Sequence, residues 1–205
     1  MFRRSAMLAA TLSLLVLSAR PAAALEVTPF AGAMMPVKTL FMDSGGSSVF
    51  RMGNHSVYGL SLGTTVSDRL GVELALGAGS GKIELIGGGE LFELESTMLF
   101  ADLRGRVGLA GGEDASLGLV LGGGYTNYKI GIFDLAEEND QGKFLGRLTG
   151  VAGLDVRAGL SDRVKLTVSA LDRIHVSGIA LDTAEGSEKT QHDLMFTAGL
   201  RFPLD

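Results

Sequence analysis

The sequence predicts an all-β protein, an eight-stranded antiparallel up-and-down transmembrane β-barrel. Segments in which apolar residues alternate with small or polar ones recur along the chain, and connections of alternating length separate them. After the first two dozen residues, no stretch approaches the roughly 20 uninterrupted apolar residues that a spanning helix needs. Any passage through a bilayer must therefore use strands.

Residues 1–24 have the organisation of a cleaved secretory signal peptide. Two arginines precede an apolar run from Ala6 to Leu17, and the small residues Ala22 to Ala24 form a cleavage site that leaves Leu25 as the mature start. The remainder, 25–205, is expected to form one barrel domain.

The composition limits the chemistry of the mature chain. Loss of the signal removes three arginines and no acid, which leaves 15 basic against 23 acidic side chains and a net charge of −8. Nucleic acid is therefore not an expected partner. The absence of cysteine excludes disulfides, a lipoprotein anchor and a cysteine-based metal or redox site. Thirty glycines are too many for a helical protein.

The first predicted strand covers about Leu25 to Met35. Pro29 suits an early strand position, where a missing backbone donor is tolerated. The pattern does not fix which face Phe30 takes.

The following strands place large apolar residues on one face and mostly Gly, Ser and Ala on the other. In chain order the apolar positions are Tyr58, Leu60, Leu62, Thr64 and Val66, then Leu70, Val72, Leu74 and Leu76, then Leu117, Leu119, Leu121 and Tyr125, then Leu148, Ala152, Leu154 and Val156, then Val164, Leu166, Val168 and Ala170.

The last predicted strand, Asp193 to Leu204, shows the clearest contrast between its faces. One face carries Leu194, Phe196, Ala198, Leu200 and Phe202, and the other carries Asp193, Met195, Thr197, Gly199 and Arg201. Strands of this kind cannot leave an unpaired edge in lipid, so they must close into a barrel.

The connections alternate between short and long. The short ones are 66–70, 110–115 and 160–164, and the long ones are roughly 37–54, 79–91, 127–144 and 174–191. This pattern implies eight strands with both chain ends on one side, since outer-membrane barrels combine short periplasmic turns with long external loops. Apolar residues in the long connections, such as Ile83 and Leu85, either pack across extended hairpins or form a partner-binding surface.

If the apolar faces contact lipid, charged residues of the other parity lie inside. These residues are Glu73, Asp102, Arg104, Asp155, Arg157, Lys165, Asp193 and Arg201. The interior of an eight-stranded barrel is just wide enough to be filled by its own side chains, so opposite charges are expected to pair. We expect a plugged lumen with a salt-bridge network, and a gated ion path is the alternative.

A soluble, lipocalin-like ligand carrier would show the same alternation with its apolar face turned inward. Its outer surface would be dense in Lys and Glu, whereas the alternates here are mostly Gly, Ser, Thr and Ala. The lack of Trp and the presence of only three Tyr favour the carrier, because membrane barrels usually have aromatic girdles.

No motif indicates a cofactor or a metal. His55, His175 and His192 do not have metal-ligand spacing, and the two glycine triplets lack the helix that follows a phosphate loop. His175-x-Ser177 resembles the His-x-Ser of the outer-membrane lipid A deacylases, with Gly178 in place of their Asn. That resemblance implies acyl-ester hydrolysis, with Glu185 or Glu188 orienting the imidazole.

Three sequence features resemble the small outer-membrane barrels of the outer membrane protein A and opacity-protein type, the porin family. They are Glu26 to Gly32 (EVTPFAG), the repeated Ser-Asp-Arg turn, and Phe196 to Phe202 (FTAGLRF). The resemblance implies a location in the Gram-negative outer membrane, with outer-membrane lipids and the barrel-assembly machinery as partners. It implies a non-enzymatic role, without a cofactor, in envelope structure or in contacts of the external loops with a surface ligand or host partner.

Overall fold

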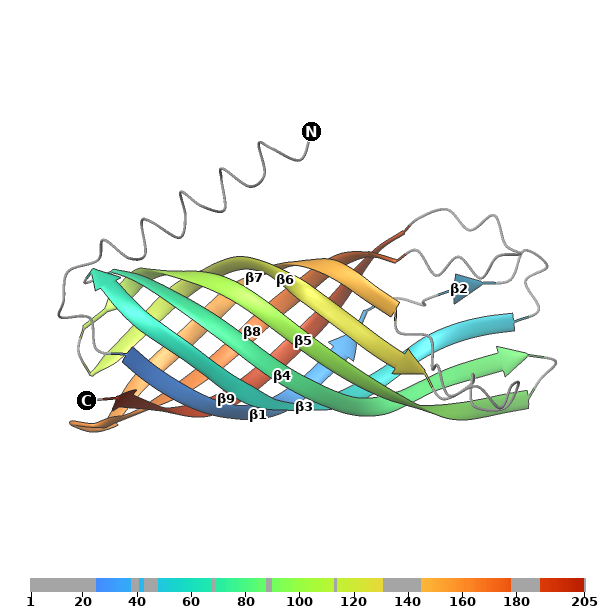
Figure 1. Cartoon of the computed structure of the whole chain (residues 1–205), viewed down its shortest axis with the longest axis horizontal. Helices are drawn as coiled ribbons and strands as arrows, with labels where there is room; N and C mark the ends of the chain where they lie inside the picture. Colours follow the sequence, from blue (N-terminus) through green and yellow to red (C-terminus); the bar gives the residue numbers. More distant parts are fainter. Residues whose placement is uncertain are drawn as a thin grey trace.

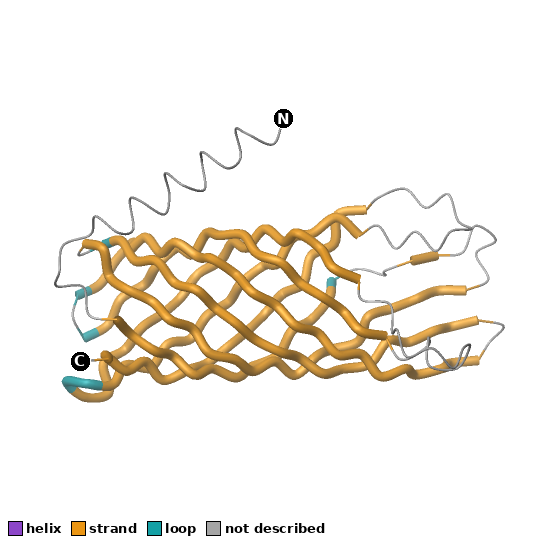
Figure 2. The backbone as a smooth tube through the Cα atoms, viewed as in Figure 1, coloured by secondary structure: helices purple, strands orange, loops and turns teal. Residues whose placement is uncertain are grey.

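A computed structural model of the chain describes residues 25–37, 41–42, 48–67, 69–87, 90–112, 114–130, 145–177 and 189–204. The predicted signal peptide, 1–24, lies outside the described residues. Strands make up nearly all of the described chain (Figure 2). In this part of the protein, no helix is long and apolar enough to cross a membrane.

The strands of the described part are β1 (Leu25–Pro36), β2 (Phe41–Met42), β3 (Ser48–Ser67), β4 (Leu70–Gly87), β5 (Glu90–Gly111), β6 (Ala115–Ile130), β7 (Leu145–Ser161), β8 (Val164–Ser177) and β9 (Lys189–Leu204). Each of β3 to β8 pairs antiparallel with the next strand, and β1 pairs with both β3 and β9. The sheet is thereby closed into an eight-stranded up-and-down barrel, as predicted, with its strands tilted around the long axis (Figure 1). β2 is a short addition that pairs with β3.

The three short turns lie at the same end of the barrel as the start of β1 and the end of β9. Leu25 pairs with Leu204 at that end. The turn between β5 and β6 depends on Gly111, which has a φ of +106°, a conformation that L side chains rarely adopt. The amide of Gly112 then donates to the Ala115 carbonyl at 2.8 Å.

At the other end, two predicted connections contain long stretches of strand. β3 begins at Ser48 inside the expected connection 37–54, and β4 and β5 remain paired up to Gly87 and Glu90 inside the expected connection 79–91. The alternation around Ile83 therefore belongs to a long hairpin, and the Ile83 side chain is buried. The side chain of Leu85 lies outside the described residues.

The apolar parity faces outward. Leu194, Phe196 and Leu200 are 37, 43 and 40% exposed, whereas their neighbours Met195, Thr197 and Arg201 are 0, 9 and 4% exposed. Exposed large apolar residues occur on all eight barrel strands, and charged residues are buried inside. This orientation is the opposite of the one that a lipocalin-like carrier requires.

The structure decides the facing of the first strand. Pro29 is exposed on the outside, and Phe30 packs against the interior cluster, with its ring centroid 6.4 Å from that of Phe100. Four buried methionines contribute to the same cluster, which therefore fills part of the bore with apolar side chains: Met34, Met52, Met98 and Met195.

Candidate functional site

The charged side chains of the barrel interior form several groups along the barrel axis. In the group nearest the short turns, Asp155 on β7 accepts from Arg106 on β5 at 2.7 Å and from Arg157 at 3.0 Å. The β6 strand lies between β5 and β7, and its residue at this level is Gly118. A Cβ at Gly118 would clash with both Asp155 and Arg106, so glycine makes room for the ion pair.

The second group surrounds Arg201 on β9. Its guanidinium lies 3.2 Å from Glu26 on β1 and 3.4 Å from Glu73 on β4. Glu73 in turn lies 3.8 Å from Arg104, which donates to Asp102 at 2.7 Å. These contacts connect β1, β4, β5 and β9 through side chains inside the barrel.

The third group crosses the middle of the lumen. Arg173 on β8 donates to Asp102 on β5, although these strands are separated in the sheet by β6 and β7. Arg173 also donates to the Thr126 hydroxyl at 2.6 Å, and its guanidinium carbon lies 4.5 Å from the centroid of the Phe100 ring. Asp102 and Arg173 are 0 and 1% exposed, so this contact joins two separate parts of the barrel wall through the buried interior.

Asp193 lies farther from the short turns. It accepts from the Tyr128 hydroxyl at 3.0 Å and from the Gln191 amide at 2.9 Å. The Nδ1 atom of His175 lies 3.7 Å from the same carboxylate. His175 is therefore buried inside the barrel and not at the lipid boundary, where the deacylase hypothesis needs it.

Most of the rest of the predicted hydrolase site lies outside the described residues. The backbone of Ser177 pairs with Lys189 at the end of β8, but its side chain lies outside the described residues, as do Gly178, Glu185 and Glu188. Among the described residues, no group of three His, Asp or Glu side chains could hold a metal ion.

The structure brings seven of the eight predicted interior charges into ion pairs or hydrogen bonds. Lys165 is the exception: it is exposed at the short-turn end and has no ion-pair partner among the described residues. Four further charged residues contribute to the interior: Glu26, Arg106, Arg147 and Arg173. Arg106 has the parity of Asp102 and Arg104 and could have been found from the sequence. Glu26 lies on the first strand, whose facing was ambiguous, and Arg147 and Arg173 lie near expected strand ends.

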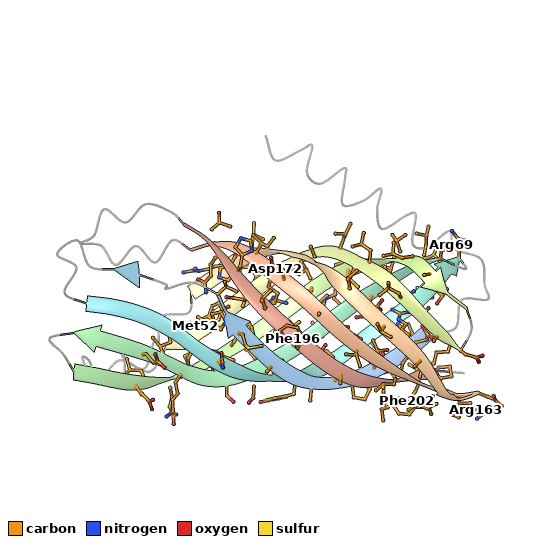
Figure 3. The ribbon with its side chains drawn as sticks, turned by 180° about the vertical axis from the view of Figure 1, so that it is seen from behind. Met52, Arg69, Arg163, Asp172, Phe196 and Phe202 are labelled. Carbon is orange, nitrogen blue, oxygen red and sulfur yellow. The ribbon has the colours of Figure 1, made fainter. Side chains whose placement is uncertain are left out.

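Polar contacts also occur on the outside of the barrel. Lys82 on β4 pairs with Glu93 on β5 in the extended hairpin, which raises the pKa of the Lys82 ammonium because the nearby carboxylate favours the charged form. His192 on β9 lies 2.8 Å from Asp172 on β8. Both pairs lie away from the short turns, and Figure 3 shows Asp172 in the opposite half of the barrel from Arg69 and Arg163.

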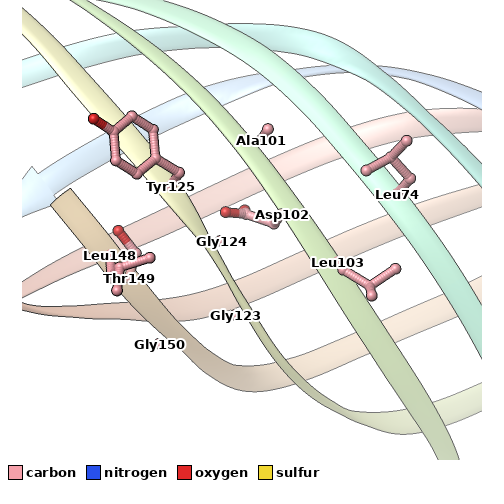
Figure 4. A pocket seen from close by; sticks show the side chains of 10 residues that line it. All are labelled: Leu74, Ala101, Asp102, Leu103, Gly123, Gly124, Tyr125, Leu148, Thr149 and Gly150. Carbon is pink, nitrogen blue, oxygen red and sulfur yellow. The ribbon is translucent and has the colours of Figure 1, made fainter. Parts of the chain in front are cut away.

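An open groove of about 660 Å³ crosses the outside of β5, β6 and β7. Small residues, Ala101, Gly123 and Gly150, leave space between the larger side chains of Tyr125 and Leu148 (Figure 4). The groove is apolar and lies on the outward parity of these strands.

The chain is similar to solved bacterial outer-membrane proteins. The outer membrane protein OprG from Pseudomonas aeruginosa matches 89% of this chain and 97% of its own, with a TM-score of 0.60 and 15% identity. Neisserial surface protein A (NspA) matches 88% of this chain and 97% of its own, with a TM-score of 0.55 and 12% identity. No protein-family model and no curated protein matches the sequence. The chain therefore has the fold of the small eight-stranded outer-membrane β-barrels.

Proposed function

We propose that the protein is an integral outer-membrane barrel with a side-chain-filled lumen and a non-enzymatic role in envelope structure or surface interaction. One observation carries this proposal: apolar side chains are exposed around the whole outside, while acids and bases pair in the interior. In a soluble protein this apolar surface would be exposed to water, which is unfavourable. In a membrane it contacts acyl chains, which solvate it well.

The outer surface also supports outer-membrane lipids as partners. Tyr58 and Tyr125 are exposed on the outside. They lie close to the level at which the outward residues of their strands change from apolar to polar, at Ser56 on β3 and at Lys129 on β6. Tyrosine is favoured at such depths because its ring is apolar and its hydroxyl is polar. The groove beside Tyr125 has the apolar character that an acyl chain needs.

The interior contacts support a plugged lumen. The Arg173 guanidinium lies between the Phe100 ring and the Asp102 carboxylate, and Met98 and Met195 are fully buried next to this layer in the interior cluster. We expect planar-bilayer recordings of the refolded protein to lack a large, steady conductance. A stable open channel would contradict the plugged lumen and would favour the gated ion path.

Membrane location has a direct test. The full chain, expressed in a Gram-negative host, should be found in the outer-membrane fraction, with Leu25 as its first residue and heat-modifiable mobility on gels. Recovery in the soluble periplasmic fraction would refute the proposal. Folding in the outer membrane would require export and the barrel-assembly machinery, so depletion of that machinery should reduce the heat-modifiable form.

We expect the β4–β5 hairpin to reach the cell surface because of its length. The hairpin continues beyond the apolar positions of β4 and β5, and it carries Lys82 and Glu93 on its outside. The chain has no cysteine, so a single engineered cysteine is the only thiol in the protein that a maleimide can label. A membrane-impermeant maleimide should label Lys82→Cys on intact cells, and label Arg69→Cys only after the outer membrane is permeabilised. Equal labelling of both on intact cells would contradict this orientation.

A further inference from the structure

The barrel interior opens at the short-turn end into a cavity of about 540 Å³, called here the mouth cavity. Figure 3 shows Arg69 and Arg163 at this end of the barrel. The described charged residues that line the cavity are five bases and one acid: Arg69, Arg106, Arg157, Lys165, Arg201 and Glu26. The deeper carboxylates of Asp155 and Glu73 neutralise part of this positive charge.

Two of the bases at the mouth cavity, Lys165 and Arg69, have no ion-pair partner among the described residues. Lys165 lies directly opposite Arg201 in the β8–β9 ladder, on the same face of the sheet. Like charges at directly opposed positions destabilise a sheet unless a counter-charge lies between them. Arg201 already forms ion pairs with Glu26 and Glu73. Within the described part of the chain, neither Lys165 nor Arg69 forms an ion pair.

We propose that the mouth cavity binds a small phosphate-type oxyanion. Guanidinium and ammonium groups are the side chains that bind phosphate oxygens best, through charge-assisted hydrogen bonds. The cavity volume is within the range of small-molecule sites. Lys165 and Arg69 are exposed and therefore free to contact such a ligand without breaking the pairs around Asp155 and Glu73.

The cavity holds its ligand and does not pass it through the barrel. A further pocket of about 30 Å³ lies among Arg106, Arg157 and Asp155. Its wall includes the apolar side chains of Val120 and Leu171, which are both buried. The inference concerns the mouth only, so it is independent of the role proposed for the external hairpin.

Titration calorimetry on the full chain folded in detergent micelles tests the proposal. Two probes distinguish the sources of the phosphate group: sodium pyrophosphate as a free anion, and a short-chain phosphatidic acid as a lipid headgroup. At constant ionic strength, at least one probe should bind saturably. Lys165→Gln should weaken that binding on the order of tenfold, because one charge-assisted contact is lost.

Lys82→Gln is the matched control, since it removes one exposed ammonium from the extended hairpin, away from the short turns. It should leave the affinity unchanged. Arg69→Gln provides a second variant of the cavity, and heat-modifiable mobility verifies that each variant is folded. The proposal is overturned if neither probe binds saturably, or if Lys165→Gln and Lys82→Gln weaken binding equally.

Discussion

The contact between Asp102 and Arg173 predicts a large loss of stability when either partner is replaced alone. Both side chains are almost completely buried, and Asp102 accepts from Arg173 and from Arg104. Asp102→Asn removes the negative charge and leaves Arg173, a buried cation, without its ion-pair partner. Breaking a buried pair in this way costs about 3–5 kcal/mol. Arg173→Met should cost a similar amount, because it leaves the Asp102 carboxylate with Arg104 alone.

The double variant separates the value of the contact from the penalty of a single unpaired charge. Replacing both partners of a buried pair by uncharged side chains is often close to neutral. We therefore expect Asp102→Asn with Arg173→Met to be more stable than the sum of the single effects by at least about 2 kcal/mol.

Urea unfolding in lipid vesicles, followed by heat-modifiable mobility and circular dichroism, measures these free energies. Lys82→Gln breaks the exposed pair with Glu93, whose side chains are 60 and 46% exposed, and should not change the midpoint measurably. A loss below about 1 kcal/mol for Asp102→Asn, or strictly additive single effects, would refute a buried ion pair that joins separate parts of the barrel wall.

Three further outcomes are expected. Phe196→Arg on the outward face of β9 should reduce the unfolding free energy in vesicles by about 2–4 kcal/mol, whereas Ser56→Arg at the polar rim should change it little. Gly77→Val should cost about 1–3 kcal/mol because its Cβ would meet the Phe100 ring, while Gly112→Ala, with no atom within 4 Å of the added carbon, should be tolerated; thermal melts of both variants measure this. Ser177→Ala should leave the acylation of lipid A unchanged in cells, as mass spectrometry of extracted lipid A can establish, and a change would favour the hydrolase hypothesis.

Closure of the barrel determined which charged groups meet. The parity of Asp102 and Arg104 predicts that both face inward, but it does not identify their partners. Arg173 lies 71 residues from Asp102 along the chain and meets it only because the closed sheet places β8 across from β5. Arg173 is the last residue before the expected connection 174–191, and the apolar alternation of β8 weakens at the neighbouring outward residue Asp172, so the pattern alone did not assign Arg173 to the interior.

The number of barrel strands, the end of the barrel at which both chain ends lie and the facing of most strands could be predicted without coordinates. The physical reason is that side chains alternate strictly along a strand, so a contrast between two faces is visible in one dimension. Three features became visible only in the folded barrel: the inward facing of Phe30, the space that Gly118 leaves for Asp155 and Arg106, and the excess of bases around the mouth cavity. These features depend on register and barrel diameter, which bring together residues that no local pattern relates.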